Sequence, residues 1–256
     1  MNLSQINPFD DLFECDKYAL LKNYLYNYLL RKQAVEKNIR AENSGLILEV
    51  GSGLSPMITS SDTIVYSELS LSGLQTLKHR HGKGWYVVAD ATHLPFRSDA
   101  FAHTVCSEAL EHIEDDRTAL KELARVLKPS GKLIITFPHR RFYFARDDHF
   151  VKHFRRYELD EMKQLIQAVG LRIFSVKKVL GPLEKITMWT AVLCFSLLEK
   201  RKSKKASAAR RGLLFHIWVL FFRVANRIFA GIAWLDARIV PLPLATVLLI
   251  RATKQQ

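Results

Sequence analysis

The sequence has few of the residues from which cross-linked folds are built. Only three cysteines occur among the 256 residues, and Cys15, Cys106 and Cys194 lie far apart. This spacing excludes a disulfide framework and a cysteine-based zinc site. The first residues carry neither a basic stretch nor an apolar one, so we expect no secretory signal and a reducing, cytoplasmic environment. Hydrophobic residues make up 48% of the chain, which excludes a disordered protein and allows a sizeable core.

Positive charge is in excess, and the excess is confined to one region. The formal net charge is +13, of which residues 181–256 carry +10, with thirteen Lys and Arg against three acidic residues. Residues 1–180 are nearly balanced at +3. A basic excess often indicates a nucleic-acid partner. Here, however, the charge coincides with a strongly apolar part of the chain.

Alternating strand-like and helix-like segments predict an α/β fold with a parallel sheet covered on both faces. Ligands of such sheets bind at the carboxyl ends of the strands. We expect strands at 46–50, 64–66, 85–89, 102–107, 132–137 and 171–180, helices at 16–40, 71–79, 117–127 and 157–170, and a turn at 129–131.

Glycines or polar residues stand at the ends of four predicted strands. Gly51 and Gly53 follow the first strand, Glu68 ends the second, Asp90 follows the third and Ser107 ends the fourth. Glycine lets the backbone approach a ligand closely. A carboxylate at the second strand end can accept hydrogen bonds from ribose hydroxyls, and an acid at the third can accept one from an exocyclic amine. Together these ends predict a nucleoside-binding edge.

Five segments agree with this prediction in order and spacing, namely Ile47–Gly53, Glu68, Val88–Phe96, Ser107–Ile113 and Leu127–Leu133. Over roughly residues 46–180 they resemble the class I S-adenosylmethionine-dependent methyltransferases, especially the small-molecule enzymes of the ubiquinone-biosynthesis type. The resemblance implies a Rossmann-like fold. Its sheet would have seven mostly parallel strands with helices on both faces, and the last two strands would pair antiparallel.

The resemblance also implies S-adenosyl-L-methionine as cofactor. Gly51 and Gly53 would line its methionine end, Glu68 would hold its ribose and Asp90 would meet its adenine amino group. The full implied set is Glu49, Gly51, Ser52, Gly53, Glu68, Leu69, Asp90, Ala91 and Ser107. The chain departs from the family where a third glycine is common, because Ser55 and Pro56 stand there; this also argues against a nicotinamide dinucleotide. Only residues 54–63 precede the second strand, so we expect the first helix to be short.

Candidates for the acceptor side follow the fifth strand. They are His139, His153, Arg156 and Tyr157. One of the histidines would act as a base, and the arginine would bind an anion. The alternative is a structural hydrogen-bond cluster at the start of the next helix. We expect no metal, because methyl transfer does not require one, although His149 and His153 could share a helical face. His112 is expected to have a structural role at a helix start.

The basic, apolar segment precedes residues 246–253, which fit the seventh strand, and is therefore predicted to be an insertion. Two apolar stretches, 186–198 and 212–235, flank a basic run at 200–205 with Arg210 and Arg211. The first stretch is too short to span a bilayer. The second contains a polar stripe of His216, Arg223, Asn226 and Arg227. This pattern favours a helix lying in an anionic membrane interface, where each Lys or Arg contributes about 1 kcal/mol.

The predicted organisation is an N-terminal helical cap (1–43), a methyltransferase core (44–182), a basic apolar helical insertion (183–243) and the final strand of the core (244–256). The predicted function is methyl transfer by in-line displacement to a small-molecule, lipid or lipid-linked acceptor, by a cytoplasmic protein bound peripherally to the inner face of the membrane. RNA methylation through the basic insertion and a non-catalytic cofactor-binding module are the alternatives. For the insertion itself, a homodimer contact and nucleic-acid binding are the alternatives to a membrane surface.

Overall fold

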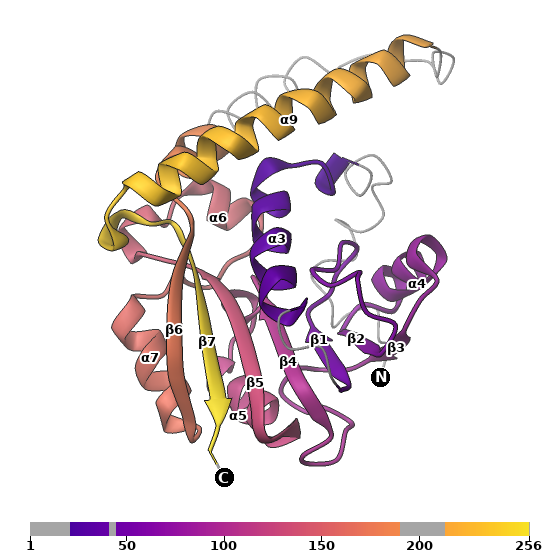
Figure 1. The fold of residues 1–256 in the computed structure, drawn as a ribbon, viewed down its shortest axis with the longest axis vertical. Coiled ribbons are helices and arrows are strands. Elements are labelled where there is room, and N and C mark those ends of the chain that lie inside the picture. Colours follow the sequence, from indigo (N-terminus) through magenta and orange to yellow (C-terminus); the bar gives the residue numbers. More distant parts are fainter. Residues whose placement is uncertain (1–20, 41–44, 190–212, 256) are drawn as a thin grey trace.

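The computed structural model describes residues 21–40, 45–189 and 213–255. Their strands form one sheet in the order β3-β2-β1-β4-β5-β7-β6 (Figure 1). The strands are β1 (Ile47–Val50), β2 (Ile64–Glu68), β3 (Trp85–Val88), β4 (Phe101–Ser107), β5 (Leu127–Pro138), β6 (Leu171–Leu180) and β7 (Val247–Lys254). The first five run parallel, and β7 runs antiparallel to both β5 and β6. The predicted sheet is confirmed.

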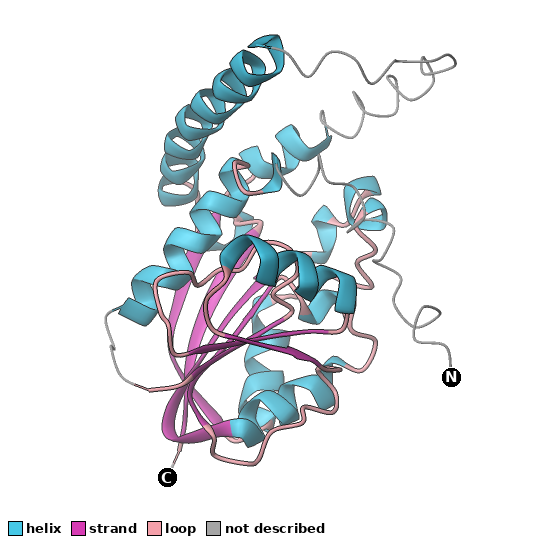
Figure 2. Cartoon of the chain, turned by 90° about the vertical axis from the view of Figure 1, so that its right-hand side faces the viewer, coloured by secondary structure: helices cyan, strands magenta, loops and turns pink. Residues whose placement is uncertain are grey.

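Helices cover both faces of this sheet (Figure 2). They are α3 (Tyr26–Arg40), α4 (Leu71–His81), α5 (Asp116–Val126), α6 (Arg146–Phe150), α7 (Leu159–Ala168) and α9 (Leu213–Ile239), with 3-10 turns η2 (Leu110–His112), η3 (Arg141–Tyr143) and η4 (Leu242–Leu244). Side-chain caps explain two of the helix starts. Ser70 accepts from the Gly73 amide at 3.1 Å, and Asp115 from the Thr118 amide at 3.0 Å.

Two hydrophobic cores lie on opposite faces of the sheet. Alternate residues of β5 point into different cores, as the two-residue period of a strand requires. Ile134 packs with residues of α3 and α4, whereas Leu133 and Ile135 pack with residues of α5 and α7. The strand order reverses between β1 and β4, where open α/β sheets bind their ligands.

The segment after β1 differs from the expectation of a short first helix, because residues 54–63 contain no helix. Side chains from elsewhere satisfy the amides that a helix would have used. Glu49 accepts from the amides of Met57 at 2.7 Å and Ile58 at 3.1 Å, and the Tyr28 hydroxyl donates to a carbonyl of the same loop at 2.7 Å. Buried contacts with β1 and α3 therefore replace helical hydrogen bonds here.

The predicted helix over 16–40 is confirmed in part: within the described residues, 21–22 and 26–40 are helical, with a break between them. α3 begins only at Tyr26, after a turn at 23–25. The side-chain oxygen of Asn27 accepts from the Tyr28 amide at 2.8 Å and satisfies one of the unpaired amides of the new helix start. Residues before 21 lie outside the described part of the chain.

The fifth strand also begins earlier than expected. Leu127 already pairs with Phe101, and a register shift follows before the regular ladder. Ser130, inside the predicted turn, has a left-handed backbone with φ 62°. The turn is therefore a bend within a longer strand rather than a connection before it.

The insertion carries the long helix α9, which crosses one end of the molecule beside α3 and β6 (Figure 1). The buried side of α9 is formed by small or polar residues: Asn226, Ala233 and Ala237. The Asn226 side-chain oxygen accepts from the Tyr26 amide at 3.1 Å. Thus Asn226, from the predicted polar stripe, faces the domain.

The opposite side of α9 is apolar and exposed. Phe221 is 70% exposed, Ile228 61% and Ile239 73%. Ile186 and Trp189, in the described start of the insertion, are exposed as well, and residues 190–198 of the first apolar stretch lie outside the described part of the chain. Among the described residues, none of the helices combines the length and apolar character that crossing a bilayer requires.

Asn226→Ala should lower the free energy of unfolding by about 1–3 kcal/mol, because it leaves the Tyr26 amide without its buried acceptor. Urea denaturation measures the change. Arg227→Ala, one position along on the exposed side, is the control and should change the free energy by less than about 0.5 kcal/mol. Equal effects of the two substitutions would contradict the docking of α9 through Asn226.

Candidate functional site

A cavity of about 320 Å³ opens beside the carboxyl ends of β1, β2, β3 and β4. Its lining includes every residue of the predicted cofactor set, namely Glu49, Gly51, Ser52, Gly53, Glu68, Leu69, Asp90, Ala91 and Ser107. His153 and Arg156 of the predicted acceptor side line it too. The cavity is completed by residues that precede the sheet or begin the insertion, among them Lys22, Tyr28, Arg31, Glu184 and Met188.

The end of β1 brings bare backbone to the cavity. Gly51 has φ +72°, and a Cβ there would lie 2.5 Å from the Ala109 Cβ. Gly53 has φ +53°, so a side chain would be strained there as well. The hydroxyls of Ser52 and Ser55 are buried in the cavity lining without a hydrogen-bond partner among the described residues. A polar ligand at this end would satisfy them.

Glu49 and Glu68 are both held by backbone amides but have different surroundings. Burial raises the pKa of Glu49 to about 7, and its carboxylate is used by the loop after β1. Glu68 accepts from the amides of Gly53 at 2.9 Å and Leu69 at 2.8 Å. Burial raises the pKa of Glu68, and these amides act against that shift. The Ser70 amide donates to Glu68 as well, at 3.3 Å, and since a carboxylate has about four acceptor positions, one is left for a ligand.

Asp90 stands exposed after β3. One of its oxygens accepts from the amide and the hydroxyl of Thr92, both at 2.8 Å. These bonds fix the side chain in position at the rim. The carboxylate can therefore meet an amine donor without reorganisation of the loop.

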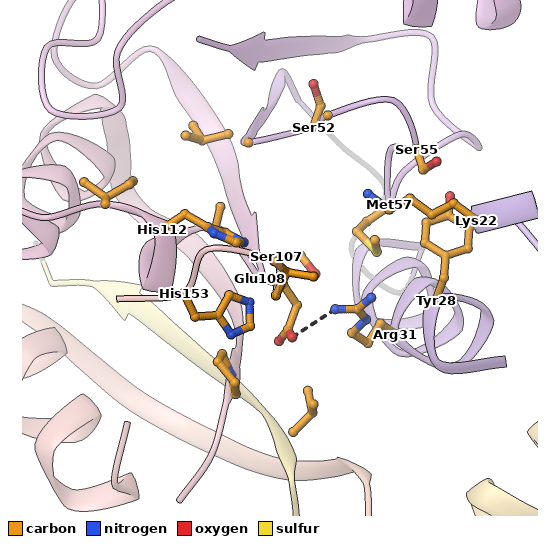
Figure 3. A pocket seen from close by; sticks show the side chains of 18 of the residues that line it. Lys22, Tyr28, Arg31, Ser52, Ser55, Met57, Ser107, Glu108, His112 and His153 are labelled. Atoms are coloured by element: carbon orange, nitrogen blue, oxygen red, sulfur yellow. Dashed lines mark ion pairs between the residues drawn. The ribbon is translucent and has the colours of Figure 1, made fainter. Parts of the chain in front are cut away.

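At the end of β4, Ser107 and Glu108 contact different neighbours. The Ser107 hydroxyl lies 2.7 Å from that of Thr136 in β5. Glu108 has a left-handed backbone with φ 51° and forms an ion pair with Arg31 of α3 at 2.9 Å (Figure 3). This pair connects α3 to the strand end.

The predicted acceptor side is organised by Asp148, which is 1% exposed. Its carboxylate lies 2.9 Å from His153 Nδ1, 2.8 Å from Arg156 Nε and 2.9 Å from Lys185 Nζ. Burial alone would raise the pKa of Asp148, but the bonds to these partners outweigh it and hold the pKa well below its usual value. Lys185 belongs to the insertion, so the network ties the insertion to the cavity.

His139 and Tyr157, also predicted for the acceptor side, are buried and are not part of the cavity lining. His139 Nδ1 lies 2.8 Å from the Ala245 carbonyl oxygen, and the Tyr157 hydroxyl donates to Asp116 at 2.8 Å. Their geometry fits the structural alternative. Roles of His153 and Arg156 toward an acceptor stay predictions.

Several lining residues had not been predicted for the site. His112 was expected to be a structural residue at a helix start, but it ends η2 and lines the cavity. Burial and the neighbouring His153 lower the pKa of His112 to about 3. Glu108 adjoins the predicted Ser107 and could have been found from the strand end. Arg31 and Glu184 come from distant segments with no local motif.

Comparison with known proteins agrees with this geometry. Residues 48–135 match the model of a family described as a methyltransferase domain. A demethylmenaquinone methyltransferase of Streptomyces avermitilis is 32% identical over 134 residues, which are 50% of this chain and 57% of that protein. One of Thermobifida fusca is 33% identical over 141 residues, covering 50% and 58%. The chain spans about half the length of these curated relatives.

Solved structures show the same fold. A SAM-dependent methyltransferase of Thermotoga maritima matches with a TM-score of 0.62 at 16% identity, covering 99% of this chain and 100% of that one. A phosphoethanolamine N-methyltransferase 2 of Haemonchus contortus, solved with S-adenosyl-L-methionine, matches with a TM-score of 0.60 at 16% identity, covering 98% and 60%.

Asp148→Asn should lower the free energy of unfolding at pH 7 by about 3–5 kcal/mol, because it leaves the buried Arg156 without a counter-charge. The folded-state pKa of Asp148 lies below its ordinary value of 3.8. Its contribution is therefore fully present above that value and is lost as the pH falls through the folded-state pKa. Denaturation curves from pH 7 to well below pH 3 should show the wild type and the variant converging only below pH 3.8, as the Asp148 carboxylate is protonated.

The matched control is Asp160→Asn, which breaks only the exposed ion pair with Lys163. It should change the free energy by less than about 1 kcal/mol at any of these pH values. A difference between Asp148→Asn and wild type that is independent of pH would contradict the electrostatic account.

Proposed function

The chain belongs to the class I S-adenosylmethionine-dependent methyltransferases, and we propose that it transfers the methyl group of this cofactor to an apolar small-molecule acceptor at a membrane surface. The observation that carries the activity is the cavity itself. All nine residues that the sequence assigns to the cofactor line it, although they come from four strand ends.

The residues present fit the cofactor. Gly51 and Gly53 leave room for close approach of a ligand to the backbone. The hydroxyls of Ser52 and Ser55, which have no hydrogen-bond partner within the described part of the chain, offer it polar contacts. Glu68 would accept from a ribose hydroxyl. Asp90 would hold the adenine amino group. Two cations of the lining, Lys22 and Arg31, would face the carboxylate of the methionine moiety; burial lowers the Lys22 pKa to about 8, which leaves most of it charged at neutral pH.

When bound, the cofactor would supply an activated methyl group for in-line displacement by an acceptor atom, with the electron pair of the broken carbon–sulfur bond left on sulfur and any proton of that atom released. The chain itself would bind the cofactor and the acceptor, orient them toward each other and exclude water from the cavity. Good orientation can lower the barrier by about 7–11 kcal/mol. Asp148 fixes the orientation of His153 and Arg156 on the acceptor side.

A quinone-like ring is the acceptor class that we favour. Two demethylmenaquinone methyltransferases are 32–33% identical to this chain over about half of its length. Exposed apolar side chains on α9 and on the start of the insertion agree with an acceptor that partitions into lipid. Labelled-methyl transfer to separated lipid, RNA and small-molecule fractions distinguishes this acceptor from an RNA acceptor.

We also propose that the exposed face of α9 binds an anionic lipid surface. Its apolar side chains are accompanied by Arg227 and Arg238, both exposed, and Arg238 lies 3.9 Å from the centre of the Trp234 ring. In the sequence, the basic run at 200–205 shortly precedes α9. Aromatic, aliphatic and cationic side chains in this combination suit a helix lying in the membrane interface.

Glu68→Gln should raise the Kd for S-adenosylmethionine about 10- to 100-fold, because a hydrogen bond to a charged group contributes about 1.5–3 kcal/mol. Isothermal titration measures it, with methyl transfer to extract fractions as a second readout. Asp62→Asn, an exposed acid paired with Lys83, is the control and should bind like wild type. Absence of binding by the wild type, or wild-type affinity of Glu68→Gln, would refute the assignment. Cofactor binding without transfer to any fraction would support a non-catalytic module instead.

Ile228→Ser/Ile232→Ser should greatly reduce cosedimentation with anionic liposomes at low salt, because it replaces two exposed apolar side chains on neighbouring turns of α9 with polar ones. The control is Trp85→Ser/Phe174→Ser, which removes exposed apolar side chains from the two edge strands β3 and β6 and should leave cosedimentation unchanged. If the wild type stays in the supernatant and light scattering shows a dimer that Ile228→Ser/Ile232→Ser abolishes, the face binds a second copy and the lipid proposal is wrong.

A further inference from the structure

Three side chains with metal-binding atoms meet at the wall of the cavity. Glu111 and His112 lie at the end of η2, and His153 follows α6. One ligand atom from each residue lies within 4.8 Å of those of the other two. The rings of His112 and His153 are 4.6 Å apart, and Figure 3 shows both on the side of the cavity opposite Tyr28.

Glu111 is the unexplained member of this group. Its side chain is fully buried, and neither carboxylate oxygen has a hydrogen-bond partner among the described residues. The His153 Nε2 atom lies 3.8 Å from one of these oxygens, which is too long for a hydrogen bond. Burial and the neighbouring Glu108 raise the pKa of Glu111. A buried carboxyl group without partners is costly, so something that binds both of its oxygens would stabilise the fold.

The two histidines are oriented as metal ligands usually are. His153 Nδ1 lies 2.9 Å from the Asp148 carboxylate, and His112 Nδ1 lies 3.3 Å from the Lys152 carbonyl oxygen. Acceptors at Nδ1 fix the tautomer that carries its proton there, so Nε2 presents a lone pair. Metal-binding histidines characteristically donate their other ring N–H to a carboxylate or a carbonyl in this way.

We propose that Glu111, His112 and His153 bind a divalent transition-metal ion, Zn²⁺ or Mn²⁺, which holds a hydroxyl oxygen of the acceptor in the cavity. Two imidazoles and one carboxylate suit such ions and leave coordination positions open for an oxygen ligand. Bonds of about 2.0–2.2 Å require the three side chains to close around the ion. His153 would then serve as a ligand rather than as a base.

The role of the ion rests on the proposed methyltransferase function, whereas its binding does not. An ion in this role would restrict the acceptor to molecules with a hydroxyl group near the methylated atom, such as the reduced form of a quinone-like ring. Arg31 keeps Glu108 engaged in an ion pair, so Glu108 is not included among the ligands.

Metal content tests the binding. Untagged protein is dialysed against EDTA, then against buffered Zn²⁺ or Mn²⁺, and the bound metal is measured by mass spectrometry; Co²⁺ serves as a spectroscopic probe through its visible absorption. We expect one ion per chain. Glu111→Gln and His153→Gln should each weaken binding at least 10-fold while circular dichroism shows a folded protein. His79→Gln, on the exposed side of α4, should bind like wild type.

Activity tests the role separately. EDTA should lower methyl transfer at least 10-fold, added Zn²⁺ or Mn²⁺ should restore it, and the Kd for S-adenosylmethionine should stay within about twofold throughout. The proposed metal site would be overturned if the wild type bound neither ion, or if the variants bound the ion as the wild type does. Unchanged transfer in EDTA would overturn the role of the ion. Loss of cofactor binding by the wild type would instead refute the proposed function and leave the metal site standing.

Discussion

A buried carboxylate, Asp148, holds the acceptor side of this cavity together. Its three partners come from different positions: His153 and Arg156 follow α6, and Lys185 begins the insertion. A desolvated carboxylate is tolerated only when such partners stay within hydrogen-bond distance. One charge therefore constrains two segments, namely the chain between β5 and α7 and the start of the insertion. The same charge orients the imidazole of His153.

The cofactor side of the site could be predicted from the sequence because its residues are local to strand ends. A short apolar strand is recognisable by itself, and parallel strands bring their carboxyl ends to one edge. Gly51, Glu68 and Asp90 therefore needed no knowledge of distant contacts, and all three line the cavity. The seven-stranded sheet and its antiparallel end followed from the same alternation and from the family resemblance.

Features that depend on distant contacts could not be predicted. The loop after β1 lacks its expected helix because Glu49 and Glu36 bind its amides, and the latter side chain belongs to α3. The interruption of the predicted helix before Tyr26 likewise depends on where α3 packs. Glu111 stood in a recognised segment, but its burial without a hydrogen-bond partner appears only when η2 is folded against the chain after α6.

Helix α3 contacts both the helix α9 and the cavity. Tyr26 at its start holds Asn226 of α9, and Arg31, about one and a half turns later, pairs with Glu108 at the cavity. If a lipid that bound α9 displaced α3, it would also move the Arg31–Glu108 pair. Occupancy of the cavity and attachment to a bilayer would then be thermodynamically linked. By the reciprocity of linked equilibria, the factor by which a bilayer changes the affinity of the cavity for its ligand is the factor by which that ligand changes attachment to the bilayer.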